Sequence, residues 1–169
     1  FFHHCQFRSL VSLVWDGNPI HPKFFTFLLR SPFLTSLSLN YCISSSSAYE
    51  AIMSISLFIQ SSRSISRLSL RGNQKRYIGN NLEMLLKYAQ SSESLQFIDL
   101  TYSKCGDAGV LQISQFLDNW TPLKELVIDG TKPKNPVPYL NLLRNAARIK
   151  NRLKLSYPNN DLQHLFQKG

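Results

Sequence analysis

The chain has 169 residues, of which 43% are hydrophobic, so it can bury one core of ordinary domain size. Its 19 lysines and arginines outnumber its 10 aspartates and glutamates, and the formal net charge of +9 favours acidic partners. Hydropathy argues against a membrane-spanning helix because no apolar run approaches the length of about 18 residues that such a helix needs.

Apolar residues recur along the chain in the motif L-x-x-L-x-L-x-x-N, which is typical of leucine-rich repeats. Five copies comprise Leu10, Leu13, Trp15 and Asn18; Leu34, Leu37, Leu39 and Cys42; Ile65, Leu68, Leu70 and Asn73; Leu95, Ile98, Leu100 and Ser103; and Leu123, Leu126, Ile128 and Thr131. The first apolar residues of successive copies are 24, 31, 30 and 28 residues apart. This spacing predicts repeats that each carry a helix.

The end of the chain resembles a sixth, degenerate copy. Leu153 and Leu155 match apolar positions, whereas Lys150 stands at the first leucine position and Pro158 at the asparagine position. Terminal repeats are commonly atypical because they present a polar outer face. We therefore expect residues 150–169 to form the terminal repeat or cap of a single domain that spans residues 1–169. Since the sequence starts at Phe1 rather than at Met, we also expect a fragment of a longer chain.

Each L-x-L segment predicts a short strand with inward leucines, followed by a polar turn residue that bonds backbone groups. Between strands the apolar period rises to about 3.6 residues, which predicts helices. The expected helical faces are Phe24, Phe25, Phe27, Leu28 and Leu29 in a short helix; Ala48, Ile52, Ile55 and Ile59; Leu82, Leu85, Leu86 and Ala89; Val110, Ile113, Phe116 and Leu117; and, after Pro136 and Pro138, Tyr139, Leu142, Leu143 and Ala146. The predicted fold is an α/β right-handed solenoid of five to six repeats, with parallel strands on the concave face and helices on the convex face.

Residues 7–157 resemble the ribonuclease-inhibitor-like subfamily of leucine-rich repeat proteins, and the segment LVSLVWDGNPI, which starts at Leu10, is the most specific part. This subfamily includes ribonuclease inhibitor, tropomodulin, the CARMIL actin regulators, NOD-like immune sensors, GTPase-activating proteins for Ran and axonemal proteins. The repeats here depart from ribonuclease inhibitor in their irregular lengths and serine-rich turns. The resemblance implies a solenoid that binds other macromolecules.

The resemblance implies a non-catalytic protein–protein interaction scaffold in the cytoplasm, within a cytoskeletal assembly of actin, microtubules or an axoneme. Actin and tubulin surfaces are acidic and would attract a basic domain. The alternative is a recognition arm of a larger protein, such as a ubiquitin-ligase receptor or an immune-type sensor. An F-box or a nucleotide-binding module upstream of Phe1 would favour this alternative.

The first candidate site lies on the concave face, where the residues that flank the inward leucines point. It comprises Arg67, Ser69, Arg71, Phe97, Asp99 and Asp129. Arg67 and Arg71 share one face of a strand, where they either bind a partner's carboxylates or are neutralised by the two aspartates. Phe97 is either an exposed anchor for a partner or is covered by a neighbouring loop.

The second candidate site is a basic cap formed by Arg144, Arg148, Lys150, Arg152 and Lys154. Lys132 and Lys134 precede it, and no acid lies between Gly130 and Asn160. The cap is either a dock for an acidic protein or a solvated rim that keeps the end of the solenoid soluble. The absence of interleaved aromatic residues argues against nucleic acid as its partner.

Residue patterns for catalysis or metal binding are weak. The sequence contains no P-loop, H-E-x-x-H, G-x-S-x-G or C-x-x-C motif, so we expect no enzymatic activity and no cofactor. His3, His4 and Cys5 are consecutive and would not converge on one zinc ion. Cys42 occupies the turn position of its repeat, which predicts a structural role. The three cysteines, Cys5, Cys42 and Cys105, lie far apart and are odd in number, which argues against a disulfide framework and favours a reducing compartment.

Overall fold

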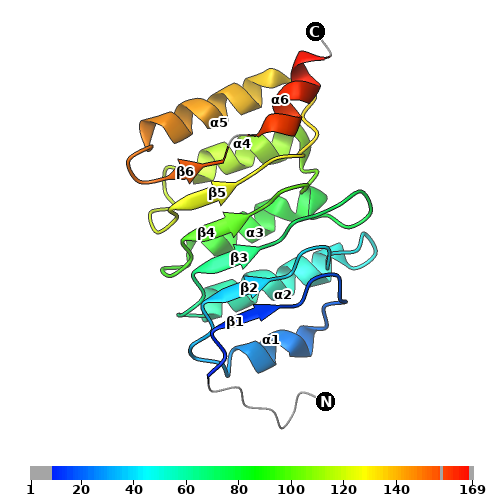
Figure 1. The fold of residues 1–169 in the computed structure, drawn as a ribbon, viewed down its shortest axis with the longest axis vertical. Helices are drawn as coiled ribbons and strands as arrows, with labels where there is room; N and C mark the ends of the chain where they lie inside the picture. The colour runs from blue at the N-terminus through cyan, green and yellow to red at the C-terminus, as the bar shows by residue number, and fades with distance from the viewer. Residues whose placement is uncertain (1–8, 157, 168–169) are drawn as a thin grey trace.

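The computed structural model describes residues 9–156 and 158–167. Strands and helices alternate along these residues, and a short 3-10 helix, η1, precedes α3 (Figure 1). The elements are β1 (Ser12–Val14), α1 (Pro22–Leu28), β2 (Ser36–Ser38), α2 (Ala48–Ser61), β3 (Arg67–Ser69), η1 (Gly79–Asn81), α3 (Leu82–Gln90), β4 (Phe97–Asp99), α4 (Gly106–Phe116), β5 (Glu125–Val127), α5 (Pro136–Arg148), β6 (Lys154–Leu155) and α6 (Asn159–Phe166).

Six strands form one parallel sheet in which each strand pairs with the next one in the sequence. Figure 1 shows the strands stacked in sequence order, with α1 to α5 behind them. The residues aligned across the centre of the sheet are Leu13, Leu37, Leu68, Ile98, Leu126 and Leu155. This alignment confirms the α/β class and the register of the first five repeats.

The core lies between the sheet and the helices, where the apolar side chains of the strands and of the helices form one buried cluster. In the four inner repeats all of these side chains are buried: Leu34, Leu37, Leu39, Ile65, Leu68, Leu70, Leu95, Ile98, Leu100, Leu123, Leu126 and Ile128. Leu13 and Leu155 are only half-buried, since the described chain places a neighbouring strand on one side of each. The opposite face of the sheet, which carries Ser12, Ser36, Arg67, Phe97, Glu125 and Lys154, is called the open face below.

The short first helix compensates for its length with aromatic packing. His21 caps α1, since its Nδ1 accepts a hydrogen bond from the Lys23 amide at 3.2 Å, and Pro22 stands in the first turn. Phe25 lies 5.4 Å from both Phe24 and Phe58 between ring centroids, which joins α1 to α2. His21 is therefore the N-cap of α1. Among the described residues, no helix has the length and apolar character needed to cross a membrane.

After β1, β2, β4 and β5, the turn places a left-handed residue four positions beyond the central apolar residue of the strand. Gly17 and Gly130 have φ values of 74° and 66° there, while Tyr41 and Tyr102 have values of 59° and 56°. The third repeat has Gly72 at this position, where a Cβ atom would lie 2.3 Å from the carbonyl oxygen of Tyr102. Glycine is required at position 72 because the neighbouring backbone leaves no room for a side chain.

The sixth repeat differs in register from the expected one. Leu155, not Leu153, pairs with Leu126 and is therefore its central residue. Arg152 consequently takes the first leucine position, and Asn160 takes the asparagine position that was assigned to Pro158. The apolar pair was ambiguous in the sequence because an arginine replaces the leucine that would have fixed the register.

A buried carboxylate fastens the last helix to the domain. Asp161, in the first turn of α6, is 2% exposed. Its Oδ2 accepts hydrogen bonds from the Thr131 amide at 2.9 Å, the Thr131 hydroxyl at 2.8 Å and the Tyr139 hydroxyl at 2.5 Å. Its Oδ1 accepts another from the Lys132 amide at 3.2 Å. Residues far apart in the sequence therefore meet at one acceptor, which closes the C-terminal end of the core.

Candidate protein-binding surfaces

A ladder of polar side chains runs across the open face from β1 to β4. In its first half, Asp16 accepts hydrogen bonds from the Ser38 hydroxyl at 2.6 Å and from the Asn40 amide nitrogen at 2.9 Å. Asn40 in turn accepts bonds from the Ser69 hydroxyl at 2.7 Å and from the Arg71 amide nitrogen at 2.8 Å. Each polar side chain thus bonds to the next repeat, and these groups hold the ends of adjacent strands in register.

The second half of the ladder is an ion pair. The Arg71 Nε atom lies 2.5 Å from Asp99 Oδ2, and the Asp99 side chain is 2% exposed whereas that of Arg71 is 49% exposed. Thr101 donates its hydroxyl to the other Asp99 oxygen at 2.6 Å. The hydrogen bond and the charge of Asp99 raise the pKa of Arg71, so this guanidinium stays protonated. Asp99 is too buried to contact a partner, and Ser69 and Arg71 are occupied within the domain.

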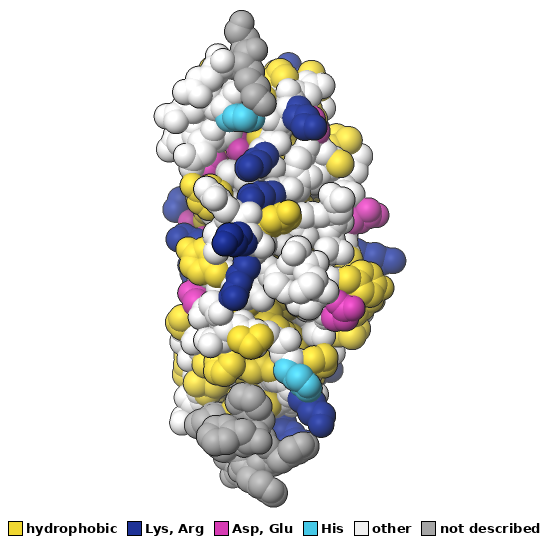
Figure 2. All heavy atoms as spheres, turned by 90° about the vertical axis from the view of Figure 1, so that its right-hand side faces the viewer, with side chains coloured by type: hydrophobic (Ala, Val, Ile, Leu, Met, Phe, Trp, Pro, Cys, Tyr) yellow, Lys and Arg dark blue, Asp and Glu magenta, His cyan; other side chains and the backbone are white. Residues whose placement is uncertain are grey.

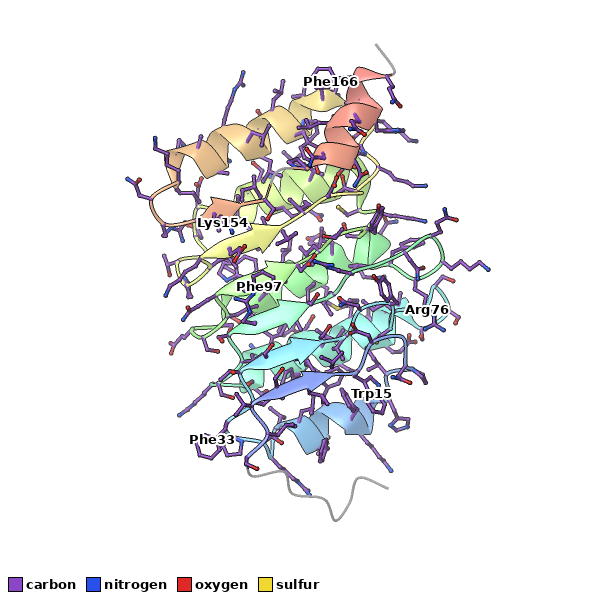
Figure 3. All side chains as sticks on the ribbon, in the orientation of Figure 1. Trp15, Phe33, Arg76, Phe97, Lys154 and Phe166 are labelled. Carbon is purple, nitrogen blue, oxygen red and sulfur yellow. The ribbon has the colours of Figure 1, made fainter. Side chains whose placement is uncertain are left out.

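Arg67 and Phe97 form the most accessible part of the predicted concave site. They are paired residues on β3 and β4, and the Arg67 guanidinium carbon lies 3.9 Å from the centre of the Phe97 ring. Arg67 is exposed and Phe97 is half-buried beneath it, near the middle of the open face in Figure 3. The expected neutralisation of both arginines by aspartates holds for Arg71 and Asp99, whereas Arg67 stacks on an aromatic ring.

Asp129 lies apart from this pair. Its Oδ2 accepts a hydrogen bond from the Asn160 side chain at 2.6 Å, and its Oδ1 accepts one from the Asp161 amide at 3.0 Å. Its role in the structure is to hold the N-terminus of α6. The six residues predicted for the concave site therefore do not form one cluster, because the aspartates serve the ladder and the C-terminal helix.

The residues of the predicted basic cap also do not form one cluster. Arg148 bonds both oxygens of Asp118, and Lys154 pairs with Glu125 at 3.0 Å. Two others, Arg144 and Lys150, are exposed and have no side-chain partner within the described part of the chain. Surface ion pairs of this kind contribute at most about 1 kcal/mol to the stability of the fold. The side chains of Arg148 and Lys154 remain available to solvent, since they are 63% and 74% exposed.

Arg152 is a structural residue rather than part of a surface patch. Its guanidinium donates hydrogen bonds to the carbonyl oxygens of Trp120 at 2.5 Å and Leu117 at 2.9 Å. These carbonyls lie at and just beyond the C-terminal end of α4, where helix carbonyls lack partners within the helix. A cation there also interacts favourably with the helix dipole. Of the five residues predicted for the basic cap, Arg152 is therefore engaged within the domain.

The structure also reveals a basic edge that the sequence analysis missed. Lys75 and Arg76 lie between β3 and η1, Lys104 between β4 and α4, and Lys132 between β5 and α5. Figure 2 looks onto this edge, where the strands end, and shows lysine and arginine side chains gathered in a column along it. The sequence offered one signal for this edge, which is the equivalent position of two lysines in their repeats. Lys104 and Lys132 each stand six residues after the central apolar residue.

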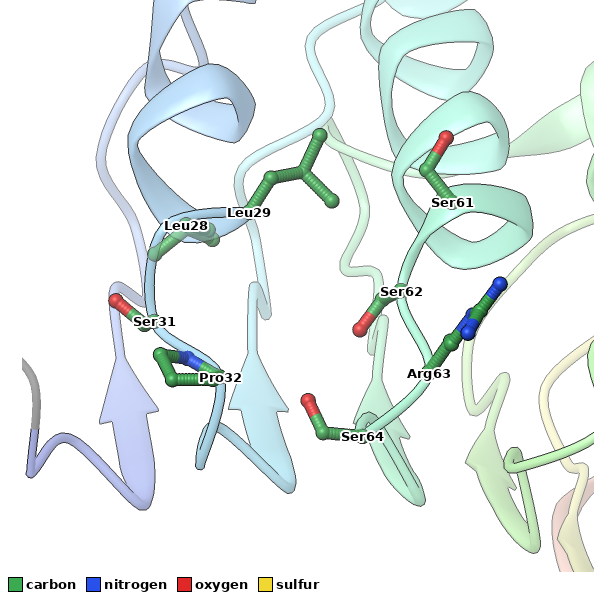
Figure 4. Close-up of a pocket in the computed structure, with 8 residues that line it drawn as sticks. All are labelled: Leu28, Leu29, Ser31, Pro32, Ser61, Ser62, Arg63 and Ser64. Atoms are coloured by element: carbon green, nitrogen blue, oxygen red, sulfur yellow. The ribbon is translucent and has the colours of Figure 1, made fainter.

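The opposite edge carries a groove between the α1–β2 and α2–β3 connections, with a volume of about 320 Å³. Figure 4 shows its lining residues, Leu28, Leu29, Ser31, Pro32, Ser61, Ser62, Arg63 and Ser64. The side chains of Ser31 and Arg63 point away from each other in this view. Ser64 donates its hydroxyl to the Leu34 carbonyl at 2.8 Å, so the serine-rich turns join successive repeats. Two of the hydroxyls that line the groove, those of Ser62 and Ser64, are thus engaged with backbone groups of the domain.

Cys42 and Cys105 are buried free thiols. Burial raises the pKa of the Cys42 thiol, and its sulfur lies 3.2 Å from the Trp15 carbonyl oxygen, which fits the predicted structural role. Burial also raises the pKa of Cys105 to about 11. Within residues 9–156 and 158–167, no three histidine, cysteine, aspartate or glutamate side chains are grouped to hold a metal ion. His3, His4 and Cys5 lie outside the described residues.

No protein-family model and no curated protein matches the sequence. Among solved structures, the tropomodulin C-terminal domain of Caenorhabditis elegans is similar, with a TM-score of 0.59, 16% identity, and coverage of 87% of this chain and 90% of that one. Leiomodin-1 actin-binding site 2 is also similar, with a TM-score of 0.64, 13% identity, and coverage of 97% and 92%. The chain therefore has the leucine-rich-repeat-like α/β fold of these two domains, neither of which is described as an enzyme.

Proposed function

We propose that this chain is an actin-binding domain of a cytoskeletal protein in the cytoplasm, built as a right-handed leucine-rich repeat solenoid of the ribonuclease-inhibitor-like subfamily. The observation that carries the proposal is its similarity to leiomodin-1 actin-binding site 2 across 97% of this chain. The net charge of +9 adds support, because actin filaments are acidic. Microtubules and axonemal assemblies are the other cytoskeletal partners that the resemblance implies.

The stacked pair of Arg67 and Phe97 is the contact that we assign to the partner. Arginine and aromatic residues dominate the binding energy of protein interfaces, and here one of each is fixed at the middle of the open face. Their geometry is set before binding, because both side chains extend from paired strands. Arg67 can therefore meet a carboxylate without losing much side-chain entropy.

Co-sedimentation tests the proposed function directly. The purified domain is centrifuged with actin filaments and, separately, with microtubules, each at low and at physiological ionic strength. We expect it to pellet with actin filaments and to bind more weakly as salt screens the charges. A domain that stays in the supernatant with actin filaments at both salt concentrations contradicts the proposal, and pelleting with microtubules alone replaces actin by tubulin.

A matched pair of charge reversals tests the surface. Arg67→Glu should lower the affinity for actin filaments about tenfold, since about 1.4 kcal/mol is lost when one desolvated charge contact becomes repulsive. Lys87→Glu makes the same change in net charge on α3, behind the sheet, and should change the affinity less than about twofold. Equal losses in the two variants would show that only net charge matters and would remove Arg67 from the interface.

A further inference from the structure

The basic loop edge, defined as Lys75, Arg76, Lys104 and Lys132, is held in place by contacts between repeats. Arg76 donates hydrogen bonds to the carbonyl oxygens of Gly17 at 2.7 Å and of another loop residue, Tyr41, at 2.8 Å. Lys104 reaches the Gln74 carbonyl oxygen at 2.5 Å. Loops that follow β1, β2, β3 and β4 are thereby joined, and Arg76 and Lys104 have fixed positions along the edge.

The positive charges on this edge are only partly compensated. Lys75 and Lys132 are exposed, and neither side chain has a partner among the described residues. Burial lowers the pKa of the Lys104 amine, and the positive charge of Lys132 lowers it further. The helices α2, α3, α4 and α5 also start on this side, and their aligned dipoles add positive potential.

Tyrosine side chains are interleaved with these cations. Tyr41 and Tyr102 are 39% and 44% exposed, and both occupy the left-handed turn position of their repeats. The Tyr102 ring lies against Gly130, where a Cβ atom would come within 2.5 Å of it. The amine of Lys104 lies 4.5 Å from the centre of the Tyr77 ring. Exposed tyrosines on a fixed backbone offer binding area at low entropic cost.

We propose that the basic loop edge is a second binding surface, which takes an acidic peptide segment of a partner protein along the column of lysines and tyrosines. This inference goes beyond actin binding, because it concerns a different surface from the pair of Arg67 and Phe97. Carboxylates of the segment pair with Lys75 and Lys132, the two exposed cations, and its neutral residues pack on Tyr102.

The acids beside the column favour a peptide over a nucleic acid. Asp107 accepts hydrogen bonds from the backbone amides of Lys134 and Asn135, and Asp129 bonds to α6. Neither forms an ion pair with a lysine or arginine of the described residues. A continuous row of phosphates would meet these carboxylates and be repelled. A peptide avoids the repulsion because it can place uncharged residues opposite them.

Fluorescence anisotropy tests this surface with a labelled peptide of alternating glutamate and serine. We expect binding at low ionic strength that weakens with salt, and no binding of the matching peptide of glutamine and serine. The double variant Lys75→Glu, Lys132→Glu should bind at least about tenfold more weakly. The control is Arg144→Glu, Lys150→Glu, which makes the same charge change at exposed cap residues and should alter binding less than about twofold.

Three results would overturn the proposal. They are equal losses in the edge and cap variants, tighter binding of single-stranded oligothymidine of the same length, and no binding of the glutamate peptide at low ionic strength. Tyr102→Ser gives a readout without a charge change and should weaken peptide binding, whereas unchanged affinity would contradict the packing role. Thermal melts of each variant show whether it is folded, and actin co-sedimentation of the edge variant separates this surface from the proposed filament contact.

Discussion

Replacing Asp161 by alanine should loosen the C-terminal end of the domain. The substitution removes one buried acceptor that serves the amide and hydroxyl of Thr131 and the hydroxyl of Tyr139. A buried donor left without a partner costs about 1–3 kcal/mol, and some water entry lowers that cost, so we expect a loss of about 3–5 kcal/mol. Asp161→Asn keeps the shape and one acceptor oxygen and should cost about 1–3 kcal/mol.

The loss should also be local, because each repeat contacts only its neighbours. Urea unfolding followed by circular dichroism measures the free energy, and hydrogen exchange measures where protection disappears. We expect α5 and α6 to lose protection while β2 and β3 keep it. Asp118→Ala is the control, since this carboxylate bonds to the exposed Arg148 and its loss should cost less than about 1 kcal/mol. An Asp161→Ala loss below about 1 kcal/mol, or equal loss of protection in β2, would refute the reasoning.

Three further substitutions test the repeat and its packing. Leu70→Ala should cost about 2–5 kcal/mol in urea unfolding, and a cost below about 1 kcal/mol would mean that its strand register is wrong. Gly17→Ala should cost about 1 kcal/mol, since Gly17 has a φ of 74° but its new Cβ atom would meet open space. Gly72→Ala should cost clearly more, because its Cβ atom would lie 2.3 Å from the Tyr102 carbonyl oxygen. Equal costs would contradict this close approach. Burial and Asp161 raise the pKa of Tyr139, so the folded state keeps this proton above the unfolded pKa of about 10 and stability should fall as the pH rises past it. Tyr139→Phe should flatten that alkaline loss, and an unchanged pH profile would exclude Tyr139 as its source.

The candidate surfaces were predicted from the sequence only in part. Alternation along a strand correctly placed Arg67 and Phe97 on the face opposite the core, because side chains of a strand point alternately to its two sides. It could not show that Asp99 is buried under Arg71, since burial of a polar side chain depends on the neighbouring strands. The basic loop edge was missed because its lysines lie about thirty residues apart and become neighbours only when the repeats stack.

The sequence by itself determined the repeat, the central leucines of five strands and the helical faces between them. These follow from local periodicity, which a strand or a helix imposes on its own residues. Only the tertiary structure decided the register of the sixth strand, the attachment of Arg152 to the end of α4 and the burial of Asp161. Each of these depends on a contact between residues about thirty positions apart, and the period of an isolated segment carries no information about such contacts.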